Sequence, residues 1–141
     1  MIRIEQVSWT YAKPPLARIR RKVFIEEQQV PEELEWDGED AEALHLLAYK
    51  GDTPIGTVRM LADGHVGRMA VLKEYRQQGI GWLLMQEIIS LARQQGLRRL
   101  ALSAQTHAIE FYQRLGFIAQ GDTFLDAGIP HRQMTLLLSR E

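Results

Sequence analysis

Cysteine is absent from this chain of 141 residues. Its absence excludes a disulfide framework, a thiolate nucleophile and the zinc sites that depend on cysteine. Long apolar runs are also missing, because no stretch reaches the roughly 18 residues that indicate a membrane-spanning helix. The first residues, MIRIE, lack the apolar core of a secretory signal. We therefore expect a cytoplasmic protein without a membrane partner.

Neither sign of charge predominates, since 17 lysines and arginines stand against 18 aspartates and glutamates. A chain without a net basic field is not expected to bind nucleic acid. The local basic clusters, RIRRK at 18–22 and Arg98-Arg99, are most simply a solvated helix face and a turn. At this length we expect one domain over residues 1–141. Such a domain buries roughly 68% of the surface that its unfolded chain exposes.

The four histidines offer no evident metal site. None of them stands three or four residues from another histidine, the spacing that places two ligands on one helix face. The serines occur in neither a G-x-S-x-G nor an S-x-x-K setting, the local patterns of serine nucleophiles. We therefore expect no metal cofactor and no serine chemistry.

The spacing of apolar residues predicts an α/β chain with a mixed sheet and the element order β-α-β-β-β-α-β-α-β-β. Alternating residues and short apolar runs predict strands at 2–9, 44–49, 55–61, 65–72, 100–102, 117–120 and 133–138. Apolar residues spaced by three or four predict helices from Pro14-Pro15 to Phe24, from Ile80 to Ala92 and from His107 to Leu115. The acid-rich segment 32–40 is predicted as a loop.

The segment EYRQQGIGWLLMQEI, residues 74–88, places Gly79 and Gly81 at the start of a predicted helix. Each glycine costs about 1 kcal/mol relative to alanine, so bare backbone there needs a reason. A helix N-terminus offers unpaired N–H groups and a partial positive charge, and Arg76 adds a cation. Trp82 after Gly81 excludes a Walker loop, and Leu84 excludes the dinucleotide fingerprint. Taken alone, the segment is either an anion site or a tight turn.

The wider context narrows that choice. A strand at 66–72, the R-x-x-G-x-G of residues 76–81, a helix, a strand and FYQRLGF at 111–117 together resemble the GNAT superfamily of N-acyltransferases over nearly the whole chain. Two further stretches, VFIEEQQVPEELEWDGED at 23–40 and FLDAGIPHRQM at 124–134, resemble its ElaA-like branch. The resemblance implies a GNAT fold, with a mixed, mostly antiparallel central sheet splayed between two parallel strands and flanked by helices. Those strands would end near Leu72 and Ser103.

The same resemblance implies that acetyl-CoA binds as the acyl donor in the cleft between the splayed strands. Backbone of Met69, Ala70 and Val71 would pair with the pantetheine arm like an added strand. Gln105, where many family members carry asparagine, would hydrogen-bond that arm, and Ala108 belongs to the same site. The pyrophosphate would be wrapped by the residues of the turn, namely Arg76, Gln77, Gln78, Gly79, Ile80, Gly81 and Trp82.

Acyl transfer to an amine needs three things: removal of a proton from the amine, N–H donors for the oxyanion, and a proton for the departing thiolate. The resemblance assigns the acid role, and a place in the cofactor site, to Tyr112. It assigns the oxyanion to the backbone N–H of Ala70 or Val71.

The general base stays open. Glu27 and His131 rank first because both fall in branch-typical stretches, and the other candidates are Asp37, His45 and Asp126. A mechanism without a dedicated base is the remaining option.

The resemblance favours an acetyl-CoA-dependent N-acetyltransferase whose small primary amine attacks the thioester directly, acting alone or as a homodimer. The acidic segment with Trp36 would attract a cationic acceptor, unless it is only a solvated loop. Arg59 and Arg68 could instead hold a carboxylate or phosphate of the acceptor. One alternative is a catalytically silent acyl-CoA sensor or interaction module with the same fold. Another is an acyl-homoserine-lactone synthase, because the stretch RRKVFIEEQ at 20–28 also resembles the N-terminal motif of those enzymes.

Overall fold

The computed structural model describes residues 1–139 of the chain. Within them the strands are β1 (Ile2–Val7), β2 (Leu44–Lys50), β3 (Thr53–Met60), β4 (Val66–Val71), β5 (Arg99–Gln105), β6 (Ile118–Asp126) and β7 (Ile129–Leu137). The α-helices are α1 (Trp9–Arg20), α2 (Glu32–Glu35), α3 (Ile80–Gln94) and α4 (Ile109–Arg114). A π-helical segment, η1 (Arg21–Glu27), continues α1, and short 3-10 turns are η2 (Asp40–Glu42), η3 (Lys73–Tyr75) and η4 (Thr106–Ala108). No helix in this part of the chain has the length and apolarity to span a membrane.

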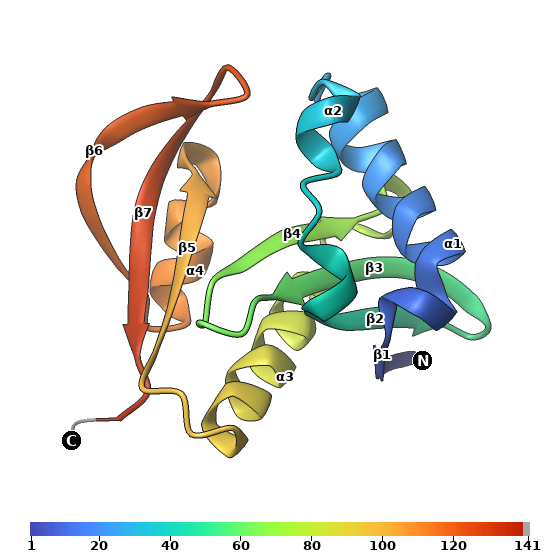
Figure 1. Ribbon diagram of the computed structural model, residues 1–141, viewed down its shortest axis with the longest axis horizontal. Helices are drawn as coiled ribbons and strands as arrows, with labels where there is room; N and C mark the ends of the chain where they lie inside the picture. The colour runs from blue at the N-terminus through green and yellow to red at the C-terminus, as the bar shows by residue number, and fades with distance from the viewer. Residues whose placement is uncertain (140–141) are drawn as a thin grey trace.

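The strands form two antiparallel sheets, with the orders β1-β2-β3-β4 and β5-β7-β6. The sheets touch through a parallel bridge between His65 and Ala101, where the Ala101 N–H donates to the Gly64 carbonyl at 3.0 Å. Beyond this point β4 and β5 run in the same direction but diverge (Figure 1). The predicted fold class, a sheet splayed between two parallel strands, is therefore confirmed.

Helices cover both faces of the first sheet (Figure 1). Successive side chains of a strand point to opposite faces, so Leu46 and Leu47 of β2 enter different clusters. Leu46 packs with the buried side chains of α3, among them Leu84, and Leu47 packs with those of α1, among them Leu16. Each such fully buried side chain contributes about 1.5–3 kcal/mol to folding. The two helices thereby fix the sheet whose last strand, β4, borders the cleft.

The first helix differs from its prediction. It begins at Trp9, where the Ser8 side chain accepts a hydrogen bond from the Tyr11 N–H at 3.2 Å, before the predicted Pro14-Pro15 start. Ala12 has non-helical dihedral angles and kinks the helix. Proline has no N–H to donate, so the pair interrupts the hydrogen bonding of the preceding turn without ending the helix.

Two further segments also differ. The acidic segment predicted as a loop contains the short helix α2. The closing strands extend through residues 121–126 and 129–132, because a turn at Ala127 and Gly128, with φ of +52° and +78°, joins them into a hairpin. Two consecutive residues at positive φ are typical of the turns that connect twisted antiparallel strands.

Strand β4 carries a β-bulge. Thr57 pairs with Ala70 and Arg59 pairs with Gly67, so Arg68 and Met69 together face one residue of β3. Arg68 adopts a φ of +52°, which is uncommon for a residue with a side chain. Bulges bend a strand and increase its twist. The bulge begins three residues after the bridge at His65 and accompanies the separation of β4 from β5.

Substitution at the junction of the sheets tests this arrangement. A Cβ atom at Gly64, where φ is +95°, would lie 2.7 Å from the Arg99 carbonyl oxygen. We expect Gly64→Ala to lower the free energy of unfolding by about 3 kcal/mol, because backbone rather than a flexible side chain must move.

The matched control is Gly51→Ala, where φ is +61° and nothing lies within 4 Å of the added Cβ. Only the left-handed backbone is strained there, so a loss of about 1–2 kcal/mol is expected. Urea unfolding of both variants measures the difference. Equal losses would show that the close approach at residue 64 does not constrain the junction.

Candidate active site

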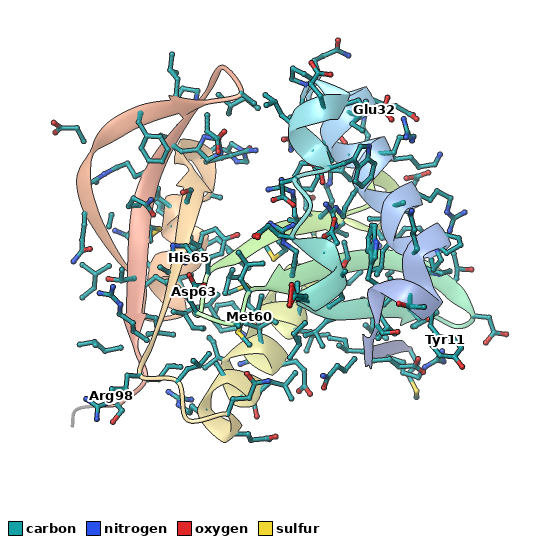
Figure 2. All side chains as sticks on the ribbon, in the orientation of Figure 1. Tyr11, Glu32, Met60, Asp63, His65 and Arg98 are labelled. Atoms are coloured by element: carbon teal, nitrogen blue, oxygen red, sulfur yellow. The ribbon has the colours of Figure 1, made fainter. Side chains whose placement is uncertain are left out.

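A cleft of about 780 Å³ lies between β4 and β5. One wall comes from η1, α2 and β4, and the other from β5, the start of α4 and the β6–β7 hairpin. His65 lies at its closed end beside Asp63, where the two sheets meet, and α2 with Glu32 lies toward its open end (Figure 2). The cavity is therefore a direct consequence of the diverging strands.

The cleft brings together residues that are far apart in the chain. Of the predicted site residues, those that line it are Glu27, Met69, Ala70, Val71, Arg76, Gln105, Ala108, Tyr112 and His131. The remaining turn residues, Gln77, Gln78, Gly79, Ile80, Gly81 and Trp82, lie next to Arg76 at the start of α3 rather than in the lining. Of the other base candidates, Asp126 lines the cleft, whereas Asp37 and His45 are outside its described lining.

The two glycines of the turn have different structural reasons. Gly79 precedes α3 with a φ of +80°, and a Cβ there would meet nothing within 4 Å. A Cβ on Gly81 would lie 3.6 Å from the Phe111 ring and 3.7 Å from the Met69 side chain. No side chain caps the start of α3, so its first N–H groups have no intrahelical or side-chain acceptor among the described residues. Open space beside free N–H groups suits an anion.

Arg76 forms a two-point ion pair with Glu27. Its two terminal nitrogens each donate to one oxygen of the Glu27 carboxylate at 2.7 Å, while Nε donates to the Val71 carbonyl at 2.9 Å. The hydrogen bond from Arg76 lowers the pKa of the Glu27 carboxyl. Arg76 therefore ties the end of η1 to the last residue of β4 within the first wall of the cleft.

The hydrogen bonding of β4 shows which backbone groups are free. The Leu72 N–H donates to the Ile55 carbonyl of β3 at 2.9 Å. Because backbone groups alternate sides along a strand, Val71 directs its N–H and carbonyl away from β3. The Val71 carbonyl accordingly accepts from Arg76. The Val71 N–H thus lies on the edge of β4 that faces the cleft.

Tyr112 belongs to α4 and lies in the second wall of the cleft. Its ring packs edge-on against Phe111 and Phe117, and burial raises the pKa of its hydroxyl to about 12. The hydroxyl makes no hydrogen bond with the residues that the structure describes, and Tyr112 lines the cleft. A tyrosine in this environment stays protonated at neutral pH and keeps a proton to donate.

The tautomer of His131 follows from its hydrogen bond. Nδ1 lies 2.6 Å from the Ile129 carbonyl oxygen, which can only accept, so Nδ1 carries the proton. In the neutral ring Nε2 then holds a free lone pair. The ring stacks on Phe124 with centroids 6.0 Å apart, which fixes its orientation in the cleft wall. In its neutral form the ring is thus oriented to accept a proton at Nε2.

A second contact crosses the cleft. The Gln105 amide nitrogen donates to the Gln28 side-chain oxygen at 2.9 Å, and the Gln105 oxygen lies 2.7 Å from Nε2 of His107. Gln28 follows Glu27 at the end of η1, so neighbouring residues reach both walls. The residue expected to hold the pantetheine arm therefore has a partner within the chain.

A buried cluster of charges, which the sequence pattern did not predict, supports the first wall. Arg20 is 1% exposed, although its basic run suggested a solvated face. Its guanidinium donates to Glu35 at 2.7 Å and to Asp40 at 2.6 Å. The rings of Trp9 and Trp36 lie over it at 5.5 Å and 5.1 Å. The only features of the sequence that could have indicated this cluster are two tryptophans and a run of acidic residues near an arginine.

The cluster continues to both arginines that were candidates for holding an acceptor. Arg59 donates two hydrogen bonds of 2.9 Å to Asp37 and one of 3.1 Å to Asp40. Although burial of itself raises the pKa of Asp37, the hydrogen bonds from Arg59 hold it at about 2. Arg68 Nε lies 3.1 Å from a Glu35 oxygen, an ion pair without hydrogen-bond alignment, and its Nη2 donates to Asp37 at 3.1 Å. Both arginines are therefore already paired within the chain.

This pairing also changes the interpretation of the acidic segment. Glu35, Asp37 and Asp40 are each bound to arginine, so that part of 32–40 is neither a solvated loop nor a free negative surface. Among the described residues no group of histidine, aspartate and glutamate is arranged to hold a metal ion.

His45 makes stability depend on pH. Its ring is 1% exposed, its Nε2 donates to the Asp40 carbonyl at 2.9 Å, and its Nδ1 is buried without a partner in the described chain. Burial lowers its pKa, so the unfolded state binds the proton first as the pH falls below about 6.5. Stability due to neutral His45 is present above that pH and is lost as the pH falls toward the folded pKa.

We expect the free energy of unfolding to fall by up to about 1.4 kcal/mol per pH unit over this range from this residue. His45→Gln removes the titrating group, so urea unfolding at pH 7.5 and 5.5 should show a smaller difference than in the parent. The same pH dependence in His45→Gln would contradict the assignment.

Comparison with known proteins agrees with the fold and the cleft. A family model described as an acetyltransferase (GNAT) domain matches residues 6–138. YjcF of Bacillus subtilis, described as an uncharacterized N-acetyltransferase, is 39% identical over 120 residues, which cover 82% of this chain and 86% of YjcF. ElaA of Escherichia coli is 29% identical over 133 residues, which cover 89% of this chain and 85% of ElaA.

Solved structures give the same picture. The crystal structure of Escherichia coli ElaA matches with a TM-score of 0.86 at 27% identity, covering 96% of this chain and 99% of ElaA. That of an acyl-CoA N-acyltransferase from Pseudomonas aeruginosa matches with a TM-score of 0.83 at 28% identity, covering 96% and 98%. These matches confirm the family that the motifs of the sequence predicted. This chain belongs to the GNAT acetyltransferase family, in its ElaA-like branch, and is an acyltransferase enzyme of the kind that uses an acyl-CoA.

Proposed function

We propose that this protein is an acetyl-CoA-dependent N-acetyltransferase in which a small primary amine attacks the thioester directly. The observation that carries the proposal is the open edge of β4 at Val71, which shares one cavity with the buried, protonated Tyr112. A backbone donor and a proton source on opposite walls are two of the three groups that acyl transfer needs.

The described residues fit acetyl-CoA at three places. The free N–H groups at Gly79 and the start of α3 suit its pyrophosphate, with Arg76 beside them. The unpaired edge of β4 from Met69 to Val71 suits the amides of the pantetheine arm, which would add to the sheet like a strand. Gln105 lies on the facing wall with an amide that can exchange its Gln28 partner for the arm.

Acetyl-CoA supplies a thioester carbonyl for the amine to attack and a thiolate as the leaving group. The Val71 N–H would stabilise the oxyanion, because it lies on the open edge of the strand. Tyr112 would donate a proton to the leaving thiolate, a role for which a hydroxyl kept protonated by burial is suited.

For the base we favour His131 over Glu27. The Ile129 carbonyl holds the His131 proton on Nδ1, which leaves Nε2 free to accept a proton from the amine directly or through water. The Glu27 carboxylate already accepts two hydrogen bonds from Arg76, and its pKa is lowered. In this proposal Glu27 holds Arg76 in place until the pyrophosphate binds.

Replacement of the acid tests the chemistry. Titration calorimetry with acetyl-CoA, followed by thiol release across a panel of amines, should show binding and turnover in the parent. Tyr112→Phe should slow thiol release by about 100-fold in single turnover, with little change in acetyl-CoA affinity, because only proton donation is lost.

Tyr49→Phe is the control, since Tyr49 lies in β2 outside the described cleft lining. Its rate should equal that of the parent. An unchanged rate in Tyr112→Phe would leave that residue a packing role only. Binding of acetyl-CoA without thiol release from any amine would favour the silent sensor, and no binding would overturn the proposal.

The helix start can be tested with a matched pair of glycines. Gly79 and Gly96 stand near the two ends of α3 with φ of +80° and +78°, and an added Cβ meets nothing within 4 Å at either. Alanine at either position should therefore lower the free energy of unfolding by a similar amount, about 1–2 kcal/mol.

Only Gly79→Ala should weaken coenzyme A binding, by about tenfold or more. The added Cβ would keep the pyrophosphate from the backbone N–H groups, and one hydrogen bond to a charged group is worth about 1.5–3 kcal/mol. Calorimetric titration of coenzyme A into both variants measures the difference. Equal affinities in the two variants would remove the pyrophosphate from the start of α3.

A further inference from the structure

One end of the cleft carries apolar side chains that the fold leaves partly exposed. The clearest is Leu34 of α2, which lines the cleft and is 52% exposed. The other partly exposed apolar residues of the whole lining are Phe24, Val30, Leu61, Met69, Val71, Ala108, Ala127 and Ile129, of which Leu61 lies at the closed end beside His65. Exposed apolar groups gathered in a concave site are typical of places that bind an apolar ligand group.

The position of Leu34 identifies this end of the cleft. Arg68 donates to the backbone carbonyls of Leu34 and Glu35 at 3.3 Å and 3.1 Å, so α2 lies against the bulge of β4. Arg76 and the start of α3 follow Val71, whereas Arg68 precedes it along the same strand. Leu34 therefore lies on the side of Val71 away from the pyrophosphate end proposed above, where the acceptor would enter.

The charges at this end are already neutralised. Glu35, Arg59 and Arg68 line the cleft, and each is ion-paired with another member of the buried cluster. Asp126 at the hairpin turn is the exception in the described lining, because its exposed carboxylate has no hydrogen bond or ion pair with the described residues. The acceptor end thus offers one free carboxylate and a partly exposed apolar surface.

We infer that the acceptor is a monoamine whose single ammonium group is attached to an apolar body, such as an arylalkylamine. The inference rests on the proposed function and names the substrate class of the same site. A polyamine would bring a second charge with no free partner, and an amino acid would bring a carboxylate when both arginines are paired. The hydroxyl groups of an amino sugar would face Leu34 and Ile129 without hydrogen-bond partners.

The experiment measures acceptor binding separately from turnover. In calorimetric titrations with saturating coenzyme A, 2-phenylethylamine should bind at least about tenfold more tightly than putrescine, glycine or glucosamine. Leu34→Lys places a charge in the apolar surface and should weaken 2-phenylethylamine binding about tenfold or more. Leu125→Lys is the matched control, because Leu125 is 71% exposed on β6 outside the described cleft lining, and it should bind as the parent does.

Thiol release from acetyl-CoA, measured on the same samples, separates the two proposals. Selective binding of 2-phenylethylamine that Leu34→Lys abolishes would support the inference. The same binding without thiol release from acetyl-CoA would overturn the proposed function and leave the inference standing. No binding, preference for a polyamine or an amino acid, or an equal effect of Leu125→Lys would overturn the inference. So would a Leu34→Lys variant that changes only the preference between acetyl-CoA and octanoyl-CoA, since the apolar surface would then serve the acyl chain.

Discussion

The cleft between the two sheets depends on the point at which hydrogen bonding between them stops. Pairing between β4 and β5 is limited to the bridge at His65 and Ala101, and the bulge at Arg68 and Met69 bends β4 soon afterwards. A strand that loses its neighbour keeps unpaired backbone groups, which are costly in a closed core but useful beside a ligand. The exposed Val71 N–H and the cavity itself both follow from that separation.

The buried charge cluster joins the elements that form one wall of the cleft. Three arginines and three carboxylates (Arg20, Arg59 and Arg68 with Glu35, Asp37 and Asp40) neutralise one another. Removing so many charges from water is expensive, so a buried network of this kind is weak evidence for stability. Its structural consequence is clearer: it fixes the short α2 against β4, which a helix of four residues could not achieve through its own hydrogen bonds.

The environments of the two proposed proton-transfer groups fix where each of them carries a proton. Burial among Phe111 and Phe117 keeps the Tyr112 hydroxyl protonated, while the Ile129 carbonyl keeps the proton of His131 on the nitrogen away from the free lone pair. The Arg76–Glu27 and Gln105–Gln28 contacts join the end of η1 to both walls, so ligand binding and the position of η1 are expected to be coupled.

The sequence alone determined the family and the order of the main elements, because these depend on local patterns such as the glycine turn and FYQRLGF. It missed the hairpin turn at Ala127 and Gly128, whose positive φ values carry little sequence signal when alanine occupies one of them. Only the tertiary structure decided which charges are free. Arg20, Arg59 and Arg68 look like surface or ligand-binding cations in the sequence, and their carboxylate partners are brought to them by folding. Whether a charge is paired depends on distances between residues remote in the chain, which local patterns do not encode.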